Sequence, residues 1–301
     1  MSLQFQPLTA DAIDVMSPYY ELRTNMTCDS VFLDGFLWKE FYQVRYSVHE
    51  GKALYWIMTV NGEDYGAMPM CREEDLPFAF HELKDYFNNV LGKKLKIYLA
   101  DEPAIQYLNL DPKEFAVTEL EDARDYLYSA EALRVLSGKK LRKKKNHINA
   151  FMRDYEGRYE YQKMGCHDRY EVWDFLMRWR GNKNSEARAE LDGEVAGIHE
   201  ILKNCAQLRV HMGGVYIDGK LEAFTVGSYN HRMKMAIIHI EKANPEIRGL
   251  YPFINQQFLI HEFPQAEIVN REDDMGLENL RVAKQSYEPM GYAKKYRVEQ
   301  L

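Results

Sequence analysis

Met233-Lys-Met-Ala-Ile-Ile-His-Ile-Glu241 is an apolar run rich in Ile and Met, and it predicts a buried central strand. The loop Asn244-Pro-Glu-Ile-Arg-Gly249 follows it, and a helix is expected from about Leu250 to Phe263. A junction of this kind presents free backbone N–H groups at the positive end of the helix dipole. The order of strand, loop and helix therefore predicts a place where a pyrophosphate could bind.

The segments around this run extend the pattern on both sides. A strand from Arg209 to Ile217 ends at Asp218-Gly219, a tight-turn pair, and a return strand follows from Leu221 to Tyr229. A short strand at 266–270, a helix at about 277–286 and a last strand near 292–298 complete the second half.

The first half has a similar plan. Strands are expected at 42–48 and 53–60, the tight-turn pair Asn61-Gly62 follows, and the return strand covers 65–70. Apolar residues at helical spacing between 76 and 91 and a strand at 96–100 come next. We therefore expect an α+β protein with two tandem lobes, at residues 1–136 and 137–301, in which mainly antiparallel sheets are flanked by helices.

Bulk properties limit the function classes. The chain has 301 residues, 46% hydrophobic residues and a formal net charge of -7, which excludes extended disorder and a general nucleic-acid coat. Neither a signal peptide nor a long apolar span is visible, so a cytoplasmic location is expected. The sequence does not predict an oligomeric state.

Cysteine and histidine patterns predict neither a disulfide framework nor a metal site. Cys28, Cys71, Cys166 and Cys205 are far apart, so buried reduced thiols are expected. The histidines form no metal-binding motif, and the chain lacks a P-loop, a dinucleotide-binding glycine motif and a nucleophile elbow. No metal is predicted.

The run Ser137-Gly-Lys-Lys-Leu-Arg-Lys-Lys-Lys145 is the strongest charge feature. Ser137 is a possible helix cap, and an apolar stripe through Leu141 and Ile148 predicts that a helix begins here. Lys145 is expected on that stripe. The run is either a solvated surface or a phosphate-binding patch, with Lys139, Lys140, Lys144 and Lys145 as the candidate contacts.

Near the C-terminus, Ala283, Tyr287 and Gly291 recur at intervals of four, so one helical turn separates the first two. Together with the Pro-Glu-x-Arg-Gly loop, this pattern resembles the GNAT acyltransferase superfamily over roughly residues 209–301. The resemblance implies two things: the loop cradles the pyrophosphate of acyl-CoA, and the tyrosine protonates the leaving thiolate. The implied cofactor-binding residues are Asn244, Ile247, Arg248, Gly249, Leu250 and Tyr251.

A narrower resemblance rests on Leu136-Ser-Gly-Lys-Lys, on Lys-Lys-Asn146-His-Ile-Asn149 and on Asn270-Arg-Glu-Asp-Asp-Met-Gly276 with the following Leu280-Arg-x-x-Lys284-x-Ser-Tyr287. These segments are similar to a bacterial family related to the catalytic domain of phosphatidylglycerol lysyltransferase. That resemblance implies two tandem GNAT lobes. The related lysyltransferase takes its acyl group from aminoacyl-tRNA.

The donor stays open between acyl-CoA and aminoacyl-tRNA. Tyr251 and Phe253 stand where the GNAT loop has small residues, so their side chains would crowd a pyrophosphate that needs direct backbone contact. An aminoacyl-tRNA donor needs no such cradle, and the basic run could meet its phosphates.

Acyl transfer to an amine or hydroxyl needs a base for the acceptor and an acid for the leaving group. Glu241, at the end of the central strand, is the candidate base, and Tyr287 is the candidate acid. The acceptor side is expected to include Asn270, Glu272, Asp273 and Lys284. The acceptor itself is left open among a small molecule, a peptide and a lipid headgroup.

A second hypothesis is a non-catalytic module that keeps the GNAT fold and binds tRNA or another polyanion. A third is a nucleic-acid-binding protein that acts through the basic helix. Turnover with an acyl donor would separate the first hypothesis from both alternatives.

Overall fold

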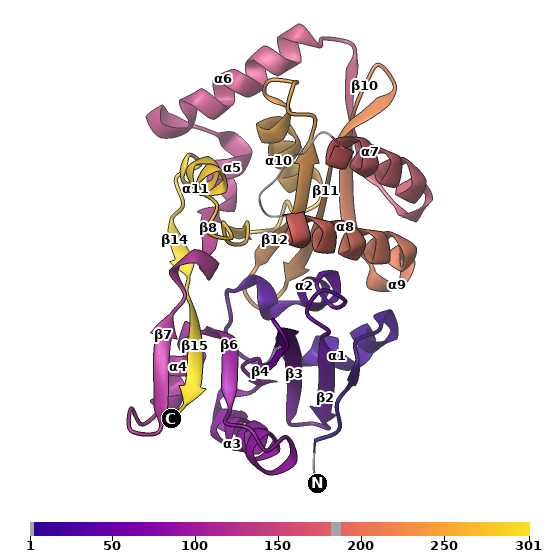
Figure 1. The fold of residues 1–301 in the computed structure, drawn as a ribbon. Helices are drawn as coiled ribbons and strands as arrows, with labels where there is room; N and C mark the ends of the chain where they lie inside the picture. Colours follow the sequence, from indigo (N-terminus) through magenta and orange to yellow (C-terminus); the bar gives the residue numbers. More distant parts are fainter. Residues whose placement is uncertain (1–2, 182–187) are drawn as a thin grey trace. The chain divides into compact units, whose positions relative to one another are not determined.

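The computed structural model describes residues 3–181 and 188–301. It divides the chain into two compact units (Figure 1). Unit 1 contains Met1–Asp125 and Ala293–Leu301, and unit 2 contains Tyr126–Tyr292. This division differs from the expected lobes 1–136 and 137–301. The last strand pairs with strands of the first half, so the C-terminal segment belongs to unit 1 and not to the second lobe.

Unit 1 is built around a mainly antiparallel sheet with the strand order β1-β2-β3-β4-β6-β15-β7, and β5 pairs with β3. Within the described residues of this sheet, β4 pairs with β6 in parallel, and the other strand pairs are antiparallel. The strands are β1 (Gln6–Pro7), β2 (Arg45–His49), β3 (Ala53–Val60), β4 (Glu63–Gly66), β5 (Met70–Cys71), β6 (Lys96–Asp101), β7 (Phe115–Glu119) and β15 (Lys295–Gln300). The helices are α1 (Ile13–Tyr20), α2 (Phe32–Leu37), α3 (Leu76–Asp85) and α4 (Glu102–Leu108), with short helical turns at Ala10–Ala12, Cys28–Ser30, Glu73–Asp75, Tyr86–Val90 and Glu121–Ala123.

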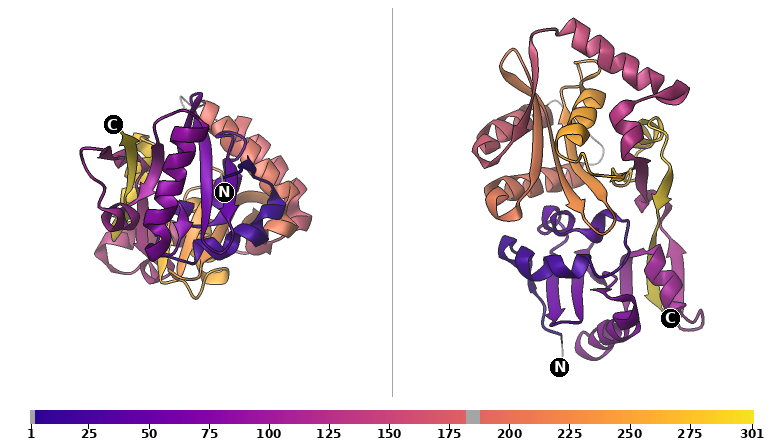
Figure 2. Two further views of the ribbon diagram at one scale, coloured as in Figure 1. Left: turned by 90° about the horizontal axis from the view of Figure 1, so that it is seen from below. Right: turned by 180° about the vertical axis from the view of Figure 1, so that it is seen from behind.

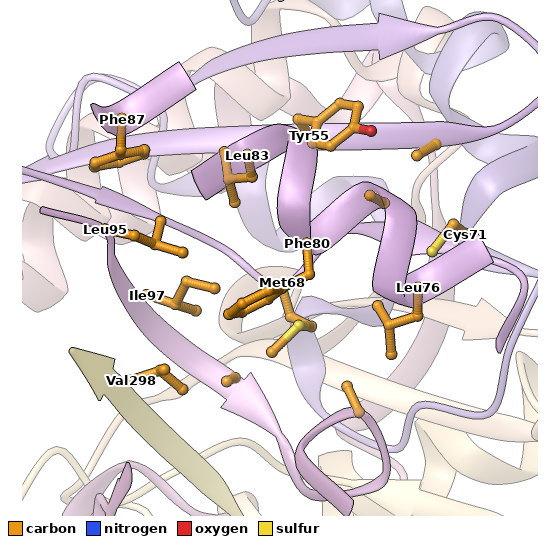
Figure 3. Close-up of a cluster of buried hydrophobic side chains, with 14 of the residues drawn as sticks. Tyr55, Met68, Cys71, Leu76, Phe80, Leu83, Phe87, Leu95, Ile97 and Val298 are labelled. Atoms are coloured by element: carbon orange, nitrogen blue, oxygen red, sulfur yellow. The ribbon is translucent and has the colours of Figure 1, made fainter. Parts of the chain in front are cut away.

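The expected hairpin between β3 and β4 is confirmed. Asn61 and Gly62 both have positive φ, 51° and 79°, as the tight turn requires. Helix α3 then packs its apolar face on the sheet, with Leu76, Phe80 and Leu83 in the buried cluster that Figure 3 shows. Burial of this apolar cluster is a main source of the stability of unit 1.

Unit 2 contains a second sheet with the order β14-β8-β13-β12-β11-β10-β9, in which the pairing of β12 with β13 is parallel. The two helix-flanked, mainly antiparallel sheets confirm the predicted α+β class. The strands are β8 (Asp125–Ser129), β9 (Tyr159–Met164), β10 (His211–Ile217), β11 (Lys220–Asn230), β12 (Met235–Ala243), β13 (Ile268–Asn270) and β14 (Gly291–Ala293). The helices are α5 (Ala130–Val135), α6 (Gly138–Asp154), α7 (Arg169–Gly181), α8 (Arg188–Lys203), α9 (Cys205–Leu208), α10 (Leu250–His261) and α11 (Glu278–Gln285), with a short helical turn at Cys166–Asp168.

Helices cover both faces of the unit 2 sheet. In Figure 1, α7 and α8 lie in front of β11 and β12, and the view from behind in Figure 2 places α10 on the opposite face. Ile238 of β12 packs with Phe258 of α10, and Phe224 of β11 packs against Phe175 of α7. Because strand side chains alternate between faces, each strand of this sheet supplies two separate surfaces.

Two predictions in unit 2 are wrong in detail. Lys145 is exposed, and Lys144 is the lysine of α6 that turns inward, because the buried stripe runs through Leu141, Ile148 and Phe151. Cys166 and Cys205 form a disulfide and are not free thiols. Their Cα atoms lie 5.7 Å apart, within the usual range, because the fold brings together segments 39 residues apart in sequence.

Cys28 and Cys71 are free and buried, as expected. No helix in the two described ranges has both the length and the apolar character needed to cross a membrane.

Candidate functional site

A buried ion pair lies at the centre of the candidate site in unit 2. Glu241 on β12 accepts a 2.9 Å hydrogen bond from Arg271, which follows β13. The other Glu241 oxygen accepts a 2.8 Å hydrogen bond from the side-chain amide of Asn255 on α10. The side chains of Glu241 and Arg271 are 10% and 12% exposed, so both charges are largely removed from water. Two donors therefore fix both oxygens of the Glu241 side chain.

Tyr287 contacts the same arginine. It lies two residues beyond the end of α11 and is 6% exposed, and the guanidinium carbon of Arg271 lies 4.5 Å from the centroid of its ring. The Tyr287 backbone N–H donates to the carbonyl of Lys284, which continues the turn after the helix. The predicted acid and the predicted carboxylate thus meet through Arg271.

Lys144 of α6 completes the cluster. Its Nζ lies 3.9 Å from the centroid of the Tyr287 ring, a distance typical of a cation–π contact. The side chain is half-buried because Lys144 follows the inward face of α6, three residues after Leu141. We call Lys144, Glu241, Arg271 and Tyr287 the acyl-transfer cluster.

Burial sets the protonation of the cluster. Desolvation, together with repulsion from Arg271 and Lys143, lowers the pKa of Lys144 to about 8. Desolvation raises the pKa of Tyr287 to about 12, although the Arg271 charge opposes the rise. Glu241 and the tyrosines around Arg271 raise the pKa of its guanidinium, which stays charged. At neutral pH the cluster therefore holds a protonated phenol and a lysine close to its titration point.

The residues expected on the acceptor side lie elsewhere or have structural roles. Lys284 Nζ donates to the backbone carbonyls of Arg271 and Asp273, so it fixes the loop after β13. Asn270 is fully buried, and its side-chain oxygen accepts from the Glu272 N–H.

The acidic residues that follow are also engaged. The Asp273 carboxylate accepts from the Met275 N–H, and Glu272 contacts His239.

The expected pyrophosphate loop is covered by α6. A Cβ at Gly249, whose φ is 88°, would lie 2.2 Å from the His147 carbonyl oxygen of α6. Leu250 is fully buried, and Phe253 packs against Phe151 with ring centroids 4.7 Å apart and the rings tilted by 45°. Arg248 is exposed. A pyrophosphate could approach Gly249 from the side facing His147 only if α6 moved.

The other members of this loop make local contacts. The side chain of Asn244 donates to Glu222 and accepts from the Glu246 N–H, which stabilises the turn. Ile247 and Tyr251 are partly buried against the apolar cluster around Phe253. The loop residues are therefore used to close the fold around the start of α10.

The first half of α6 carries a positive outer surface. Lys139, Lys140 and Lys145 are exposed, and so are Arg142 and Lys143. Lys140 forms an ion pair with Glu288, near the C-terminal end of α11, at 2.9 Å. The predicted basic run thus divides into exposed charges and the single inward Lys144.

One group of residues in unit 1 has the spacing of metal ligands: Cys28, Asp29 and Asp34. The Lys295 ammonium lies 3.2 Å from the Cys28 sulfur and 3.2 Å from an Asp29 oxygen. Since a cation would have to share this space with the ammonium, these residues fit a metal poorly.

Sequence analysis missed Arg271 and Asn255. Arg271 lies within the Asn270–Gly276 segment but was given no role there, and Asn255 lies in none of the quoted segments; each reaches Glu241 across at least 14 residues of sequence. A usable signal is the position of Arg271 directly after a short strand next to β12, at the same edge where Glu241 ends its strand.

Comparison with known proteins gives the family. The family model described as "Phosphatidylglycerol lysyltransferase, C-terminal" matches residues 23–299. The chain therefore belongs to this family.

Individual relatives agree with this result. The structure is similar to a conserved protein of unknown function from Bacteroides thetaiotaomicron, with 26% identity, a TM-score of 0.89 and coverage of 99% of this chain and 100% of that one. L-PGS from Bacillus licheniformis has the same fold, with 15% identity, a TM-score of 0.67 and coverage of 95% and 91%. An uncharacterized protein of Mycoplasmoides gallisepticum is 26% identical over 204 residues, which cover 67% of this chain and 65% of that protein.

Proposed function

We propose that this chain transfers an aminoacyl group from aminoacyl-tRNA to a hydroxyl or amine acceptor, and that the acyl-transfer cluster carries the chemistry. The observation that carries the proposal is the convergence of Lys144 and Arg271 on Tyr287, with Glu241 holding Arg271. The family supplies the reaction class, because its name describes the transfer of lysyl groups.

Each member of the cluster has a role that its environment supports. Neutral Lys144, with a pKa of about 8, accepts the proton of the acceptor hydroxyl or amine. The acceptor oxygen or nitrogen forms a bond to the ester carbonyl carbon, and the charged Arg271 stabilises the oxyanion. The bond to the ribose oxygen then breaks, and Tyr287, which is protonated below a pKa of about 12, donates a proton to that oxygen.

Glu241 has a different role from the one expected from the sequence. Both of its oxygens accept hydrogen bonds, from Arg271 and from Asn255, so neither is oriented to remove a proton from an acceptor. We propose that Glu241 is a positioning residue that fixes the Arg271 guanidinium. Lys144 replaces it as the base.

Two features favour tRNA over CoA as the donor. At the start of α10, the His147 carbonyl and Phe151 lie against Gly249 on the side where a Cβ would stand, which crowds a pyrophosphate approaching from that side. The exposed lysines and arginines of α6 lie on the same helix as Lys144, so phosphates bound there would lead toward the cluster. The local charge supports a polyanionic donor despite the net charge of -7.

The acceptor is proposed from the family name. Phosphatidylglycerol offers a free glycerol hydroxyl, and a hydroxyl acceptor needs the base that neutral Lys144 provides. A lipid headgroup is therefore the first acceptor to test, before peptides and small amines.

The test is a transfer assay with total bacterial tRNA charged with 14C-labelled amino acids, first lysine. The purified protein is incubated with this tRNA and phosphatidylglycerol vesicles, and the label is counted in the lipid extract and in acid-soluble amine products. Lys144→Met should abolish transfer, whereas Lys139→Met, on the exposed part of the same helix, should retain it with weaker tRNA binding. Salt-dependent tRNA binding without any transfer would contradict the proposal and support the non-catalytic module.

A further inference from the structure

A second line of reactive side chains lies in unit 2, outside the acyl-transfer cluster. The Ser228 hydroxyl on β11 lies 2.7 Å from Nε2 of His239 on β12. Nδ1 of the same imidazole lies 2.7 Å from a carboxylate oxygen of Glu272. A hydroxyl, an imidazole and a carboxylate are thus joined in the order that nucleophilic serines use.

The sheet separates this line from the acyl-transfer cluster. A Cβ at Gly227 would lie 3.0 Å from Phe258 of α10, so Gly227 faces α10 and the next residue, Ser228, faces the other side. Ile238 packs with the same Phe258, and His239 follows it. Glu241, by contrast, bonds to Asn255 of α10. The two groups of residues therefore lie on opposite faces of one sheet.

A β-bulge directs the imidazole. Val226 pairs with Ile240 and Gly227 pairs with Ile238, so the register shifts at His239, which is the additional residue of the bulge. A bulge of this kind re-aims a side chain and often lies next to a reactive site. Here it turns the His239 ring toward Ser228 on the neighbouring strand and toward Glu272 beyond β13.

The hydrogen bonds fix the proton positions for a neutral imidazole. An ionised carboxylate only accepts, so Nδ1 carries the hydrogen and donates it to Glu272. Nε2 is then the acceptor, and the Ser228 hydroxyl donates to it. This is the tautomer that lets the imidazole take a proton from a serine during attack. The His239 side chain is fully buried and Glu272 is 20% exposed, which limits competition from water, and Ser228 is half-buried.

We propose that Ser228 is a nucleophile toward carboxylic esters, with His239 as its base and Glu272 as the residue that orients the imidazole. The serine oxygen forms a bond to the ester carbonyl carbon, and its proton passes to Nε2. The bond to the alcohol oxygen breaks, and the alcohol leaves with that proton. Water then attacks the serine ester, gives a proton to Nε2 and releases the carboxylic acid, and Ser228 regains its hydrogen. The net reaction is hydrolysis of one ester to one acid and one alcohol.

The test uses a fluorophosphonate probe, which bonds covalently to activated serines with loss of fluoride, and p-nitrophenyl acetate as the ester. Intact-mass measurement should show one added probe, and peptide sequencing should place it on Ser228. Ser228→Ala should abolish labelling, and His239→Gln and Glu272→Gln should slow it by about 100-fold or more. Ser17→Ala removes an exposed serine of unit 1 and is the matched control, which should label at the wild-type rate.

Two results would overturn the proposal, and both require folded protein. Circular dichroism and thermal melts first establish that each variant is folded. A folded wild-type protein that takes up no probe overturns the proposal, and so does labelling of Ser228 that persists unchanged in His239→Gln and Glu272→Gln. The labelling uses neither tRNA nor lipid, so its failure leaves the proposed aminoacyl transfer unaffected, and failure of that transfer leaves this proposal unaffected.

Discussion

Helix α6 contacts two regions of unit 2, and its role differs between them: it contributes a side chain to one and covers the backbone of the other. At the acyl-transfer cluster it contributes the half-buried Lys144, which contacts Tyr287. One turn later its His147 carbonyl closes the backbone at Gly249, the start of α10. The sequence predicted ligand contacts at both places. This difference shows that a motif read from sequence, the Arg-Gly of the loop, can be packed against a neighbouring helix, while charges one turn away on that helix form a separate cluster.

The largest effect is expected from breaking the ion pair at the centre of the cluster. Glu241→Ala leaves the Arg271 charge buried without its carboxylate, so the free energy of unfolding should fall by about 3–5 kcal/mol. Urea unfolding followed by circular dichroism measures the change. Glu246→Ala, which removes an exposed carboxylate from the α10 loop, is the control and should change it by less than about 0.5 kcal/mol. Equal losses in the two variants would show that the Glu241 pair is no more important than a surface charge.

The pH dependence of transfer tests the base. Lys144 must be neutral to accept a proton, and burial places its pKa at about 8. The rate should therefore rise about tenfold per pH unit below pH 8 and level off above it. The measurement is initial transfer rate from pH 6 to pH 9, corrected for spontaneous hydrolysis of the donor ester. Lys144→Arg keeps the positive charge at every pH tested, so its transfer rate should be low and should not increase with pH. A transfer rate of the wild type that does not change with pH would argue against Lys144 as the base.

A substitution at Gly249, where α6 packs against the start of α10, is expected to change the stability less. Gly249→Ala places a methyl group 2.2 Å from the His147 carbonyl and requires an alanine at a φ of 88°, so α6 and α10 must separate. We expect a loss of about 1–3 kcal/mol in stability, measured by thermal melting. The matched control is Gly219→Ala, at a φ of 77° in an open turn, which has the same backbone cost but no atom within 4 Å. If both variants lose the same stability, the contact between α6 and Gly249 contributes nothing.

The fold was largely predictable because its signals are local. The pairs Asn61-Gly62 and Asp218-Gly219 determined both hairpins, and the apolar runs of β3 and β12 have the expected bounds within two residues. The placement of β15 in unit 1 was not predictable, since its pairing with β6 and β7 joins segments nearly two hundred residues apart. The Cys166–Cys205 disulfide was missed for the same reason.

The site was predictable only in part. Glu241 was expected from its position at the end of the central strand and Tyr287 from its motif. The structure connects them through Arg271, whose position after a short strand was a signal that the sequence analysis did not use. Assigning Lys145 instead of Lys144 to the inner face was an error of one residue along a helix, which rotates a side chain by about 100°. The closure of Gly249 by α6 depends on tertiary packing that no local pattern reports.

The central claim is that Tyr287 in the acyl-transfer cluster, and not the loop before α10, serves acyl transfer. The most direct measurement is the single-turnover transfer of 14C-lysine from lysyl-tRNA to phosphatidylglycerol in vesicles, with enzyme in excess over the tRNA. The rate is compared among the wild type, Tyr287→Phe and Arg248→Ala. We predict that Tyr287→Phe slows transfer by about 100-fold, because the acid is lost, and that the exposed Arg248→Ala changes it by less than about twofold. Transfer that survives Tyr287→Phe unchanged but is lost in Arg248→Ala would contradict the account.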